Sequence, residues 1–469
     1  MNLKRAVLPI LGAFLITGCT SMRIPNSNKP LGQRISSSKM IVQKRKQEAN
    51  SLSIGQKAEY FNNRLGEFIT PRDLVSKTNN EARENISDLE QTSLYLANLA
   101  FEYQSNKNPK IQERAKKTIS SIINADKSNG LDGYIPNHTK EINGELNPIK
   151  DKVTHSNAYS QLFFGYLMAY NSFNNQEITE KIKSHLEIIT QYFLKNNLSI
   201  ITPENKKANY SDLSISRYQL SRSRCLDTLV FLEMADKFSN DKRIQKLKKQ
   251  AIGAGYLDKI QTLEINFLNW KIPTASSDWL NSIRLYTLNN LNPKEEYQQA
   301  FIKFFEETKE EENALFNSLY LSTFPNLRNR ERVSSQIKNS LSQFPLSLDN
   351  SEIINSKNKG FPKRIFPRII KNKPYFESKK PLPPYARPIR GSVWKINSHQ
   401  LNGNYNSPGN KKYTGLDYLL TYNLFNSITE TEENFALVLE DRRGMEERFE
   451  NFLKNQNYTV FHADKVKEA

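Results

Sequence analysis

The sequence predicts an all-α protein built as a ring of helical hairpins, an (α/α)6 toroid, and three observations lead to this prediction. Helical periodicity runs through most of the chain, and convincing period-two alternation of apolar residues does not appear before its far end. Two kinds of helix alternate, one apolar on nearly all sides and one with a single apolar stripe. A helix that is apolar all round must be buried on all sides. Six such helices, each beside an amphipathic partner, therefore form two concentric layers.

The first 18 residues have the order of a secretory signal. Lys4 and Arg5 precede an apolar run from Ala6 to Thr17. A run of about 12 residues is too short to cross a bilayer, which takes roughly 20. The run ends in Ile-Thr-Gly followed by Cys19, which resembles the lipobox of bacterial lipoproteins. This resemblance implies diacylglycerol on the Cys19 sulfur, cleavage before Cys19 and acylation of the new amino terminus. A plain secreted protein is the alternative.

The same resemblance gives a location. Thr20, rather than Asp, follows Cys19. In lipoproteins of Gram-negative bacteria this implies a lipid anchor in the outer membrane, on its periplasmic or its surface side. In a Gram-positive cell it would mean the outer face of the cell membrane. Residues 19–49 hold few apolar side chains, so we expect a flexible tether there, followed by the toroid at 50–430 and a carboxy-terminal helix and tail at 431–469.

The helices that are apolar all round define the expected inner layer. They are Leu89 to Tyr103, Ala158 to Tyr170, Leu220 to Ala235, Trp279 to Leu291, Ala314 to Leu321 and Leu416 to Phe425. Striped helices follow five of them directly, with apolar residues spaced three and four apart on one face. The sixth has two candidate partners, a segment from Asn434 to Phe452 and a helix before Phe68. A superhelix of hairpins is the competing fold, but we find no fixed-period repeat of the kind that stacked repeats show.

This layout resembles the six-hairpin glycosidase-like superfamily over roughly residues 50 to 430. The likeness is carried by LEQTSLYLANLAFEYQSNKNPKIQERAKKTISSI and NGLDGYIPN, by HSNAYSQLFFGYLMAYNSF, by SDWLNSIRLYTLNNL, and by YNSPGNKKYTGLDYLLTYNLF. It is a likeness of layout, since none of the active-site motifs of its glycoside hydrolases, glucuronyl hydrolases, lyases or epimerases is complete here. The resemblance implies a protein that binds a carbohydrate polymer or hydrolyses it as a glycoside hydrolase does.

A long segment, residues 347–412, departs from simple hairpins. It is rich in proline and holds 14 Lys and Arg against 3 Asp and Glu, so it carries +11 of the formal net charge of +18. Loops of this length inside a domain are usually functional or disordered. Aromatic residues among its prolines favour a loop that packs on the body. The basic balance points to anionic neighbours, an acidic polysaccharide above all, and nucleic acid is not expected outside the cell. The bland alternative is compositional drift.

Several kinds of chemistry have no support. The chain lacks a phosphate-binding glycine loop, a GxSxG elbow and an HExxH pair, and its 5 histidines are too scattered to predict a metal site. We therefore expect no cofactor and no metal, in a monomer. If Cys19 carries lipid, Cys225 has no partner for a disulfide. It lies in a strongly apolar helix, so a buried inert thiol is expected.

Candidate catalytic residues come from the amino ends of the buried helices, which converge on one mouth if the helices are parallel. Glycoside hydrolysis needs two carboxylates, and Asp88, Asp278 and Asp417 are the candidates. Each is also a preferred helix cap, although Thr414 can cap the last helix in place of Asp417. His155 is a candidate general acid or base. Candidate substrate-binding residues are Asn157, Arg222, Trp279, Trp394 and Tyr413.

Two functions remain open from the sequence. One is an envelope lipoprotein whose toroid binds or hydrolyses a polysaccharide. The other is a non-catalytic envelope lipoprotein that docks an acidic glycan or protein partner. Two carboxylates facing each other across an open mouth would favour the enzyme. A mouth plugged by the proline-rich segment, or lined by Arg and Lys without a carboxylate pair, would favour docking.

Overall fold

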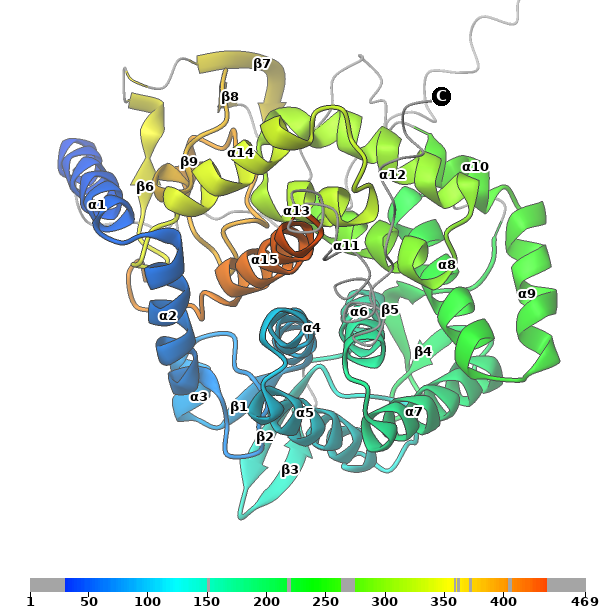
Figure 1. Cartoon of the computed structure of the whole chain (residues 1–469). Coiled ribbons are helices and arrows are strands. Elements are labelled where there is room, and N and C mark those ends of the chain that lie inside the picture. Colours follow the sequence, from blue (N-terminus) through cyan, green and yellow to red (C-terminus); the bar gives the residue numbers. More distant parts are fainter. Residues whose placement is uncertain are drawn as a thin grey trace, which may run out of the picture.

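The computed structural model describes residues 30–149, 152–216, 221–262, 275–357, 360, 363–370, 373–403 and 407–436. Its inner layer is a closed ring of helices (Figure 1). In order these are α4 (Leu89–Asn106), α6 (Ser156–Ser172), α8 (Arg222–Phe238), α11 (Ala275–Leu291), α13 (Ala314–Thr323) and α15 (Leu416–Ala436). Each contacts the next, and α15 contacts α4. This closure excludes an open superhelix, and the predicted (α/α)6 toroid is confirmed.

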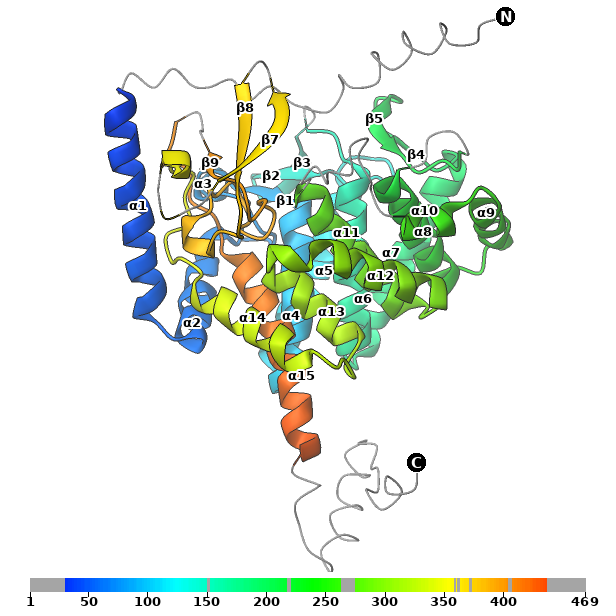
Figure 2. The same ribbon diagram turned by 90° about the horizontal axis from the view of Figure 1, so that it is seen from above.

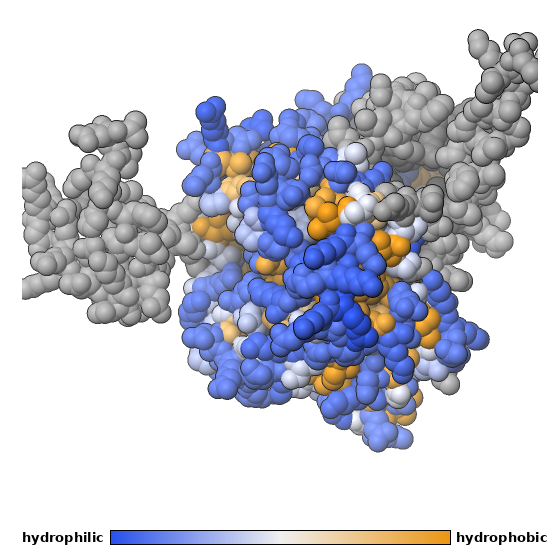
Figure 3. All heavy atoms as spheres, turned by 90° about the vertical axis from the view of Figure 1, so that its right-hand side faces the viewer, coloured by the Kyte–Doolittle hydropathy of each residue, from blue (hydrophilic) through white to orange (hydrophobic). Residues whose placement is uncertain are grey.

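The outer layer consists of the striped helices. They are α2 (Ile54–Leu65), α5 (Pro109–Lys127), α7 (Gln176–Lys195), α9 (Lys242–Gly253) with the short α10 (Tyr256–Gln261), α12 (Glu295–Thr308) and α14 (Arg330–Ser342). The surface on the α9 side is mostly hydrophilic (Figure 3), as helices with one apolar stripe require. Of the two predicted partners for α15, the helix before Phe68 is confirmed, because α2 packs on α15. Most of the other candidate lies outside the described residues.

The inner helices pack closely because small residues lie between them. Gly165 of α6 faces α4, and a Cβ atom there would lie 2.5 Å from the backbone oxygen of Ser93. Without that side chain, the two backbones approach each other directly. The inner helices share one hydrophobic core with the apolar stripes of the outer layer, so burial, the main favourable contribution to folding, is spread round the whole ring.

The two sides of the ring differ in their connections (Figure 2). Each of the first five inner helices is joined to the outer helix that follows it by a short connection, such as residues 107–108 and 173–175. Most connections on the opposite side, which we call the amino face because the inner helices begin there, are long. They hold α3 (Asn79–Arg83), a sheet of β1 (Ile86–Asp88), β2 (His138–Ile142) and β3 (Glu145–Pro148), and the pair β4 (Ser199–Ile201) and β5 (Lys207–Asp212).

The predicted proline-rich segment, residues 347–412, is one of these connections, and its described part is ordered. It holds two antiparallel pairs, β6 (Ile353–Ile354) with β9 (Asn402–Gly403) and β7 (Lys363–Ile370) with β8 (Lys373–Ser378). Short 3-10 turns follow β6 and precede Arg387. Phe344, Trp394 and Tyr418 then pack on one another, which fixes the end of the segment on the ring.

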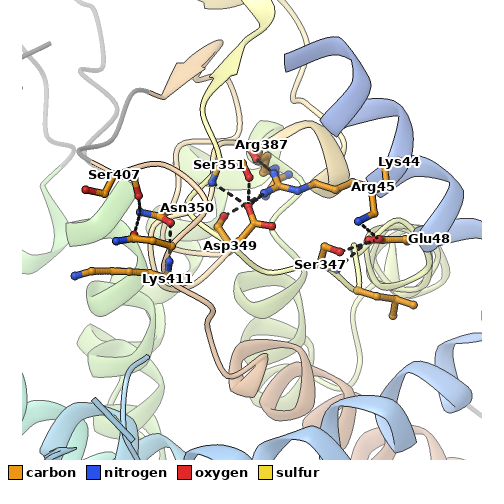
Figure 4. A network of polar contacts seen from close by, with 12 residues as sticks. Lys44, Arg45, Glu48, Ser347, Asp349, Asn350, Ser351, Arg387, Ser407 and Lys411 are labelled. Carbon is orange, nitrogen blue, oxygen red and sulfur yellow. Dashed lines mark hydrogen bonds and ion pairs between the residues drawn. The ribbon is translucent and has the colours of Figure 1, made fainter. Parts of the chain in front are cut away.

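The expectation of a flexible tether at 19–49 is wrong for its second part. Residues Leu31–Ser51 form α1, which lies against the 347–412 segment (Figure 4). Its contacts are mainly polar. Arg45 is 1 % exposed and donates to the backbone oxygen of Arg387 and to Asp349, at 3.3 and 3.0 Å. Polar contacts between residues 304 positions apart, as for Arg45 and Asp349, leave no apolar pattern in the sequence. The low hydrophobicity of this segment therefore did not reveal that it forms a helix.

The predicted lipid attachment at Cys19 lies outside the described residues, as do residues 437–469 of the predicted tail. Residues 431–436 continue α15 rather than starting a new helix. In the described part of the chain, no helix is both long and apolar enough to cross a bilayer.

Candidate functional site

The amino face is the candidate site, because the first turns of all six inner helices meet there and their backbone N–H groups need partners. Side chains of the chain itself supply many of them. Asp88 accepts from the N–H of Gln91 at 3.0 Å, and Ser221 accepts from that of Arg224 at 3.2 Å. Asn313 caps α13 in the same way. The helix ends are therefore partly satisfied from within.

Asp88, at the start of α4, is buried and is held by a second element. It is 2 % exposed, and its Oδ2 lies 3.2 Å from Nε2 of His138 on β2. Burial alone raises the pKa of Asp88, but the hydrogen bond and charge of His138, with the charge of Lys77, bring that pKa below its usual value. Asp88 is thus an ionised cap that joins α4 to the sheet of β1, β2 and β3.

Asp417, at the start of α15, is covered by the 347–412 segment. Its Oδ2 accepts from the backbone N–H of Val393 at 2.6 Å and from the hydroxyl of Ser392 at 3.0 Å. Thr414 caps α15, as predicted, by accepting from Leu416 N at 3.1 Å. Burial raises the pKa of the Asp417 carboxyl, and its neutral donors offset that rise only in part. Asp417 therefore holds the loop down onto the helix.

Trp394 is the centre of this cover. The side chain is completely buried, and its indole N–H donates to the backbone oxygen of Asp417 at 3.1 Å. Its own backbone oxygen accepts from Asn313 at 2.9 Å. The segment thereby contacts the starts of α13 and α15 together, and Trp394 presents no face to a ligand.

Lys395 extends the cover to two further helices. Its ammonium lies 4.0 Å from the ring centroid of Trp279 on α11 and 3.5 Å from a carboxylate oxygen of Glu90 on α4. Trp279 is 1 % exposed and Asp278 beside it 2 % exposed. Residues 392–395 therefore reach the amino ends of α4, α11, α13 and α15. We call them the cover strand, although they form bends and turns and no β-strand.

Elsewhere on the amino face, side chains of neighbouring ring helices pair with one another. Arg284 of α11 is 1 % exposed and lies 2.5 Å from Asp227 of α8. It also donates to Asn157 and Asn281 at 2.9 Å each. Burial lowers the pKa of Arg284, while Asp227 and the more distant Glu90 act in the opposite direction. This buried ion pair links α8 and α11, with α6 contributing through Asn157.

The other predicted residues lie in several environments. His155 and Asn157 are exposed at the start of α6, and the Asn157 oxygen is held by Arg284. Arg222 is buried and directed at the outer layer, where it binds Glu307 of α12 at 2.7 and 2.8 Å. Tyr413 is 5 % exposed, and burial raises its pKa to about 12.

The structure thus places the three predicted aspartates in separate surroundings. Asp88 binds His138, Asp417 binds the cover strand, and Asp278 is buried in the first turn of α11. The half-buried Glu90, with Lys395 at its side, is a more accessible carboxylate than any of them. All three carboxylates are buried, and those of Asp88 and Asp417 bond to groups of the chain itself.

Sequence reasoning missed the pair Asp227 and Arg284. Each is a charged residue in the middle of an inner helix, among mostly apolar neighbours. Such a residue is almost never fully buried unless it is paired, so two of them in neighbouring inner helices are a signal for an ion pair. Lys395 gave no comparable signal, because its partners on α4 and α11 are distant in sequence.

A groove of about 460 Å³ lies beside the 347–412 segment, next to the contacts shown in Figure 4. Tyr60, Asn63 and Arg64 of α2 line one side, and Lys412 lies with residues 346–349 on the other. Tyr60 is 38 % exposed. An exposed aromatic ring beside an amide and two cations is chemistry that suits an acidic sugar.

Among the described residues, no three His, Cys, Asp or Glu side chains gather as metal ligands would. Cys225 is buried, and this burial raises its pKa to about 11, so the thiol is protonated at neutral pH. Asp132, in the loop after α5, is exposed, while Gly133 in the same loop donates to Asp126.

Searches of protein-family models and of curated proteins found no match to this sequence. Solved structures with a similar chain course include a GH76 α-mannanase from Bacteroides thetaiotaomicron, at 10% identity and a TM-score of 0.44, covering 82% of this chain and 99% of that one. A sugar epimerase from a ruminal bacterium is 11% identical with a TM-score of 0.41, over 85% and 97%. The fold of this chain rests on its own closed ring of helices.

Proposed function

We propose that this protein is a lipid-anchored envelope protein whose toroid binds an acidic glycan without cleaving it. The observation that carries the proposal is the cover strand. Ser392, Val393 and Trp394 bond to Asp417 and Asn313, on the face where an (α/α)6 enzyme would need an open mouth. There Asp88 caps α4 and Asp417 binds the loop, roles that need no substrate.

The anchor is the second part of the proposal, and it rests on residues 1–19 of the sequence. A positive start, a short apolar run and a cysteine directly after Ile-Thr-Gly are the features that resemble a lipoprotein signal. Several acyl chains hold a protein to a bilayer essentially permanently, whereas one chain binds marginally. The mass of the mature protein tests the anchor, since cleavage before Cys19 with acylation gives a defined value. An unmodified Cys19 would overturn it.

The groove beside α2 is the place where we expect the glycan. Arg64 donates to the backbone oxygen of Leu346 at 3.1 Å, which holds its guanidinium near the groove, and Lys412 is exposed. The basic balance of the 347–412 segment attracts polyanions toward it. Glu67 and Asp349 also line the groove, so we expect the ligand to carry hydroxyl groups as well as carboxylates.

The deciding experiment incubates the purified full-length protein with acidic and neutral bacterial glycans and measures both binding and release of reducing ends. We expect salt-sensitive binding of acidic glycans and no release. Tyr60→Ala and Lys412→Ala should each weaken binding several-fold, while Lys110→Ala, a change at an exposed lysine of α5, should not. Reducing-end release that Asp88→Asn or Asp278→Asn abolishes would replace this proposal with hydrolysis. Failure of every glycan to bind, with capture of an acidic protein instead, would make the ligand a protein.

A further inference from the structure

The direction of α1 relates the lipid anchor to the ring. The helix is fixed along its length: Ser38 accepts from the N–H of Ile354 at 2.7 Å, and Glu48 accepts from Ser347 at 2.7 and 3.0 Å. Nearer its start, Arg34 binds Glu352 through both of its carboxylate oxygens. The amino end of α1 is therefore held in place by several contacts.

That end lies on the side of the amino face. Figure 2 shows the start of α1, the paired strands β7 and β8 and the β4–β5 pair on one side of the ring, while the carboxyl end of α15 leaves on the other. Cys19 precedes Leu31 by 12 positions. Even a fully extended chain of 12 residues spans at most about 40 Å, whatever its conformation. A lipid on Cys19 is thus held within that distance of the amino end of α1.

Basic and acidic segments of the chain also lie at the two different sides of the ring. Residues 363–370 and 373–380, which form β7, β8 and the two positions after them, contain 6 Lys and Arg and 1 Glu, a net charge of +5. Ile, Phe and Tyr residues are interspersed among them. At the far end of α15, residues 430–433 are ETEE. Basic segments near a membrane are attracted to anionic headgroups, and this attraction falls off within a Debye length.

We propose that the amino face lies against the membrane that holds the lipid on Cys19, with the β7–β8 pair contacting anionic lipid headgroups. This inference rests on the lipid anchor of the proposed function. It places the sides of the ring, including the groove beside α2, where a glycan of the surrounding space reaches them. The opposite side, with its short connections, faces away from the bilayer.

The test measures which side approaches lipid. A fluorophore is attached at Lys373→Cys, the first residue of β8, or at Lys110→Cys, an exposed position on the opposite side. Cys225 does not interfere, because it is fully buried. Lipidated protein is reconstituted into vesicles that contain about 30% anionic lipid, so that their surface is negatively charged. A quencher attached to the lipid headgroups is then added. We expect quenching several-fold stronger at position 373 than at 110.

Charge variants show whether the hairpin makes the contact. In the Lys373→Cys protein, Arg364→Glu with Arg368→Glu should lower the quenching toward that of position 110. The matched pair Lys242→Glu with Lys246→Glu, two exposed lysines of α9, changes the net charge equally and should leave it unchanged. Equal quenching at 373 and 110, or stronger quenching at 110, would overturn the inference. The mass of the mature protein reports separately on the anchor, so the two proposals fail in distinguishable ways.

Discussion

Two parts of the amino face are closed in different ways. At α4, α11, α13 and α15, the cover strand brings a distant segment onto the helix ends, through Asp417, Asn313 and Lys395. At α6, α8 and α11, the ring closes itself through the buried pair Asp227 and Arg284. The first closure consists of loop contacts laid over a finished ring, whereas the second lies between the ring helices. We therefore expect the second to matter more for stability.

The largest effect should come from breaking the ion pair. Arg284→Ala leaves Asp227 as a buried charge without its partner, and such changes cost about 3–5 kcal/mol. Urea unfolding of the variant should show a free energy of unfolding lower by that amount, and therefore a lower midpoint. Replacing both residues, Asp227→Ala with Arg284→Ala, should cost less than the single change because no unpaired charge remains. Arg243→Ala, which removes an exposed pair with Asp241, should leave the midpoint unchanged. A wild-type midpoint for Arg284→Ala would contradict the distinction between the two closures.

The cover strand should respond less, and in a way that depends on the acceptor. Asp417→Ala removes the oxygen that binds Val393 N–H and Ser392, and an unsatisfied buried donor costs about 1–3 kcal/mol. Asp417→Asn keeps an acceptor oxygen and removes the buried charge, so its unfolding free energy should stay near that of the wild type. Thermal or urea unfolding of the two variants checks this. If Asn were as damaging as Ala, the carboxylate charge itself would be needed.

The pH dependence should separate the two buried helix-start aspartates. The lowered pKa of Asp88 means that its contribution to stability is present above the unfolded pKa and is lost as pH falls through the folded one. The raised pKa of Asp417 has the opposite sign: it opposes folding at neutral pH, and that cost is relieved as pH falls through its folded pKa.

Unfolding free energies measured from about pH 5 to pH 3, the range in which carboxyl groups ordinarily titrate, test this sign. Acidification should reduce the advantage of the wild type over Asp88→Asn and should shift the balance between wild type and Asp417→Asn toward the wild type. Asn also caps helices well, so neither variant loses its cap. Parallel behaviour of the two variants would contradict the different surroundings of the two carboxylates.

The sequence predicted the ring and its pairs of helices because both depend on local periodicity. Three inner helices begin at the residue that the sequence predicted, which are Leu89, Ala314 and Leu416. The closure of the amino face was not predicted, because it depends on contacts between residues far apart. Asp417 and Trp394 were candidate site residues by type and position, yet they bond to each other's segment. A carboxylate at a helix start has the same sequence signature whether a loop or a substrate occupies its oxygens.

The smallest effect should come from Lys395, which joins the cover strand to α11. Its ammonium over the ring of Trp279 contributes about 0.5–1 kcal/mol at a partly exposed site. Lys395→Met keeps the length of the side chain and removes the charge, so the unfolding midpoint should move only slightly. The emission of Trp279 should change, because the cation lies 4.0 Å from its ring centroid; a Trp279→Phe protein supplies the background of the other tryptophans. Lys107→Met, beside Tyr103 on the opposite side, should leave the tryptophan emission unchanged. Lys395 also neutralises Glu90, whose charge acts on Arg284. If the two closures are coupled through Glu90, the loss of unfolding free energy caused by Arg284→Ala should be larger in the Lys395→Met protein than in the wild type. If they are independent, the losses of the two single variants should add.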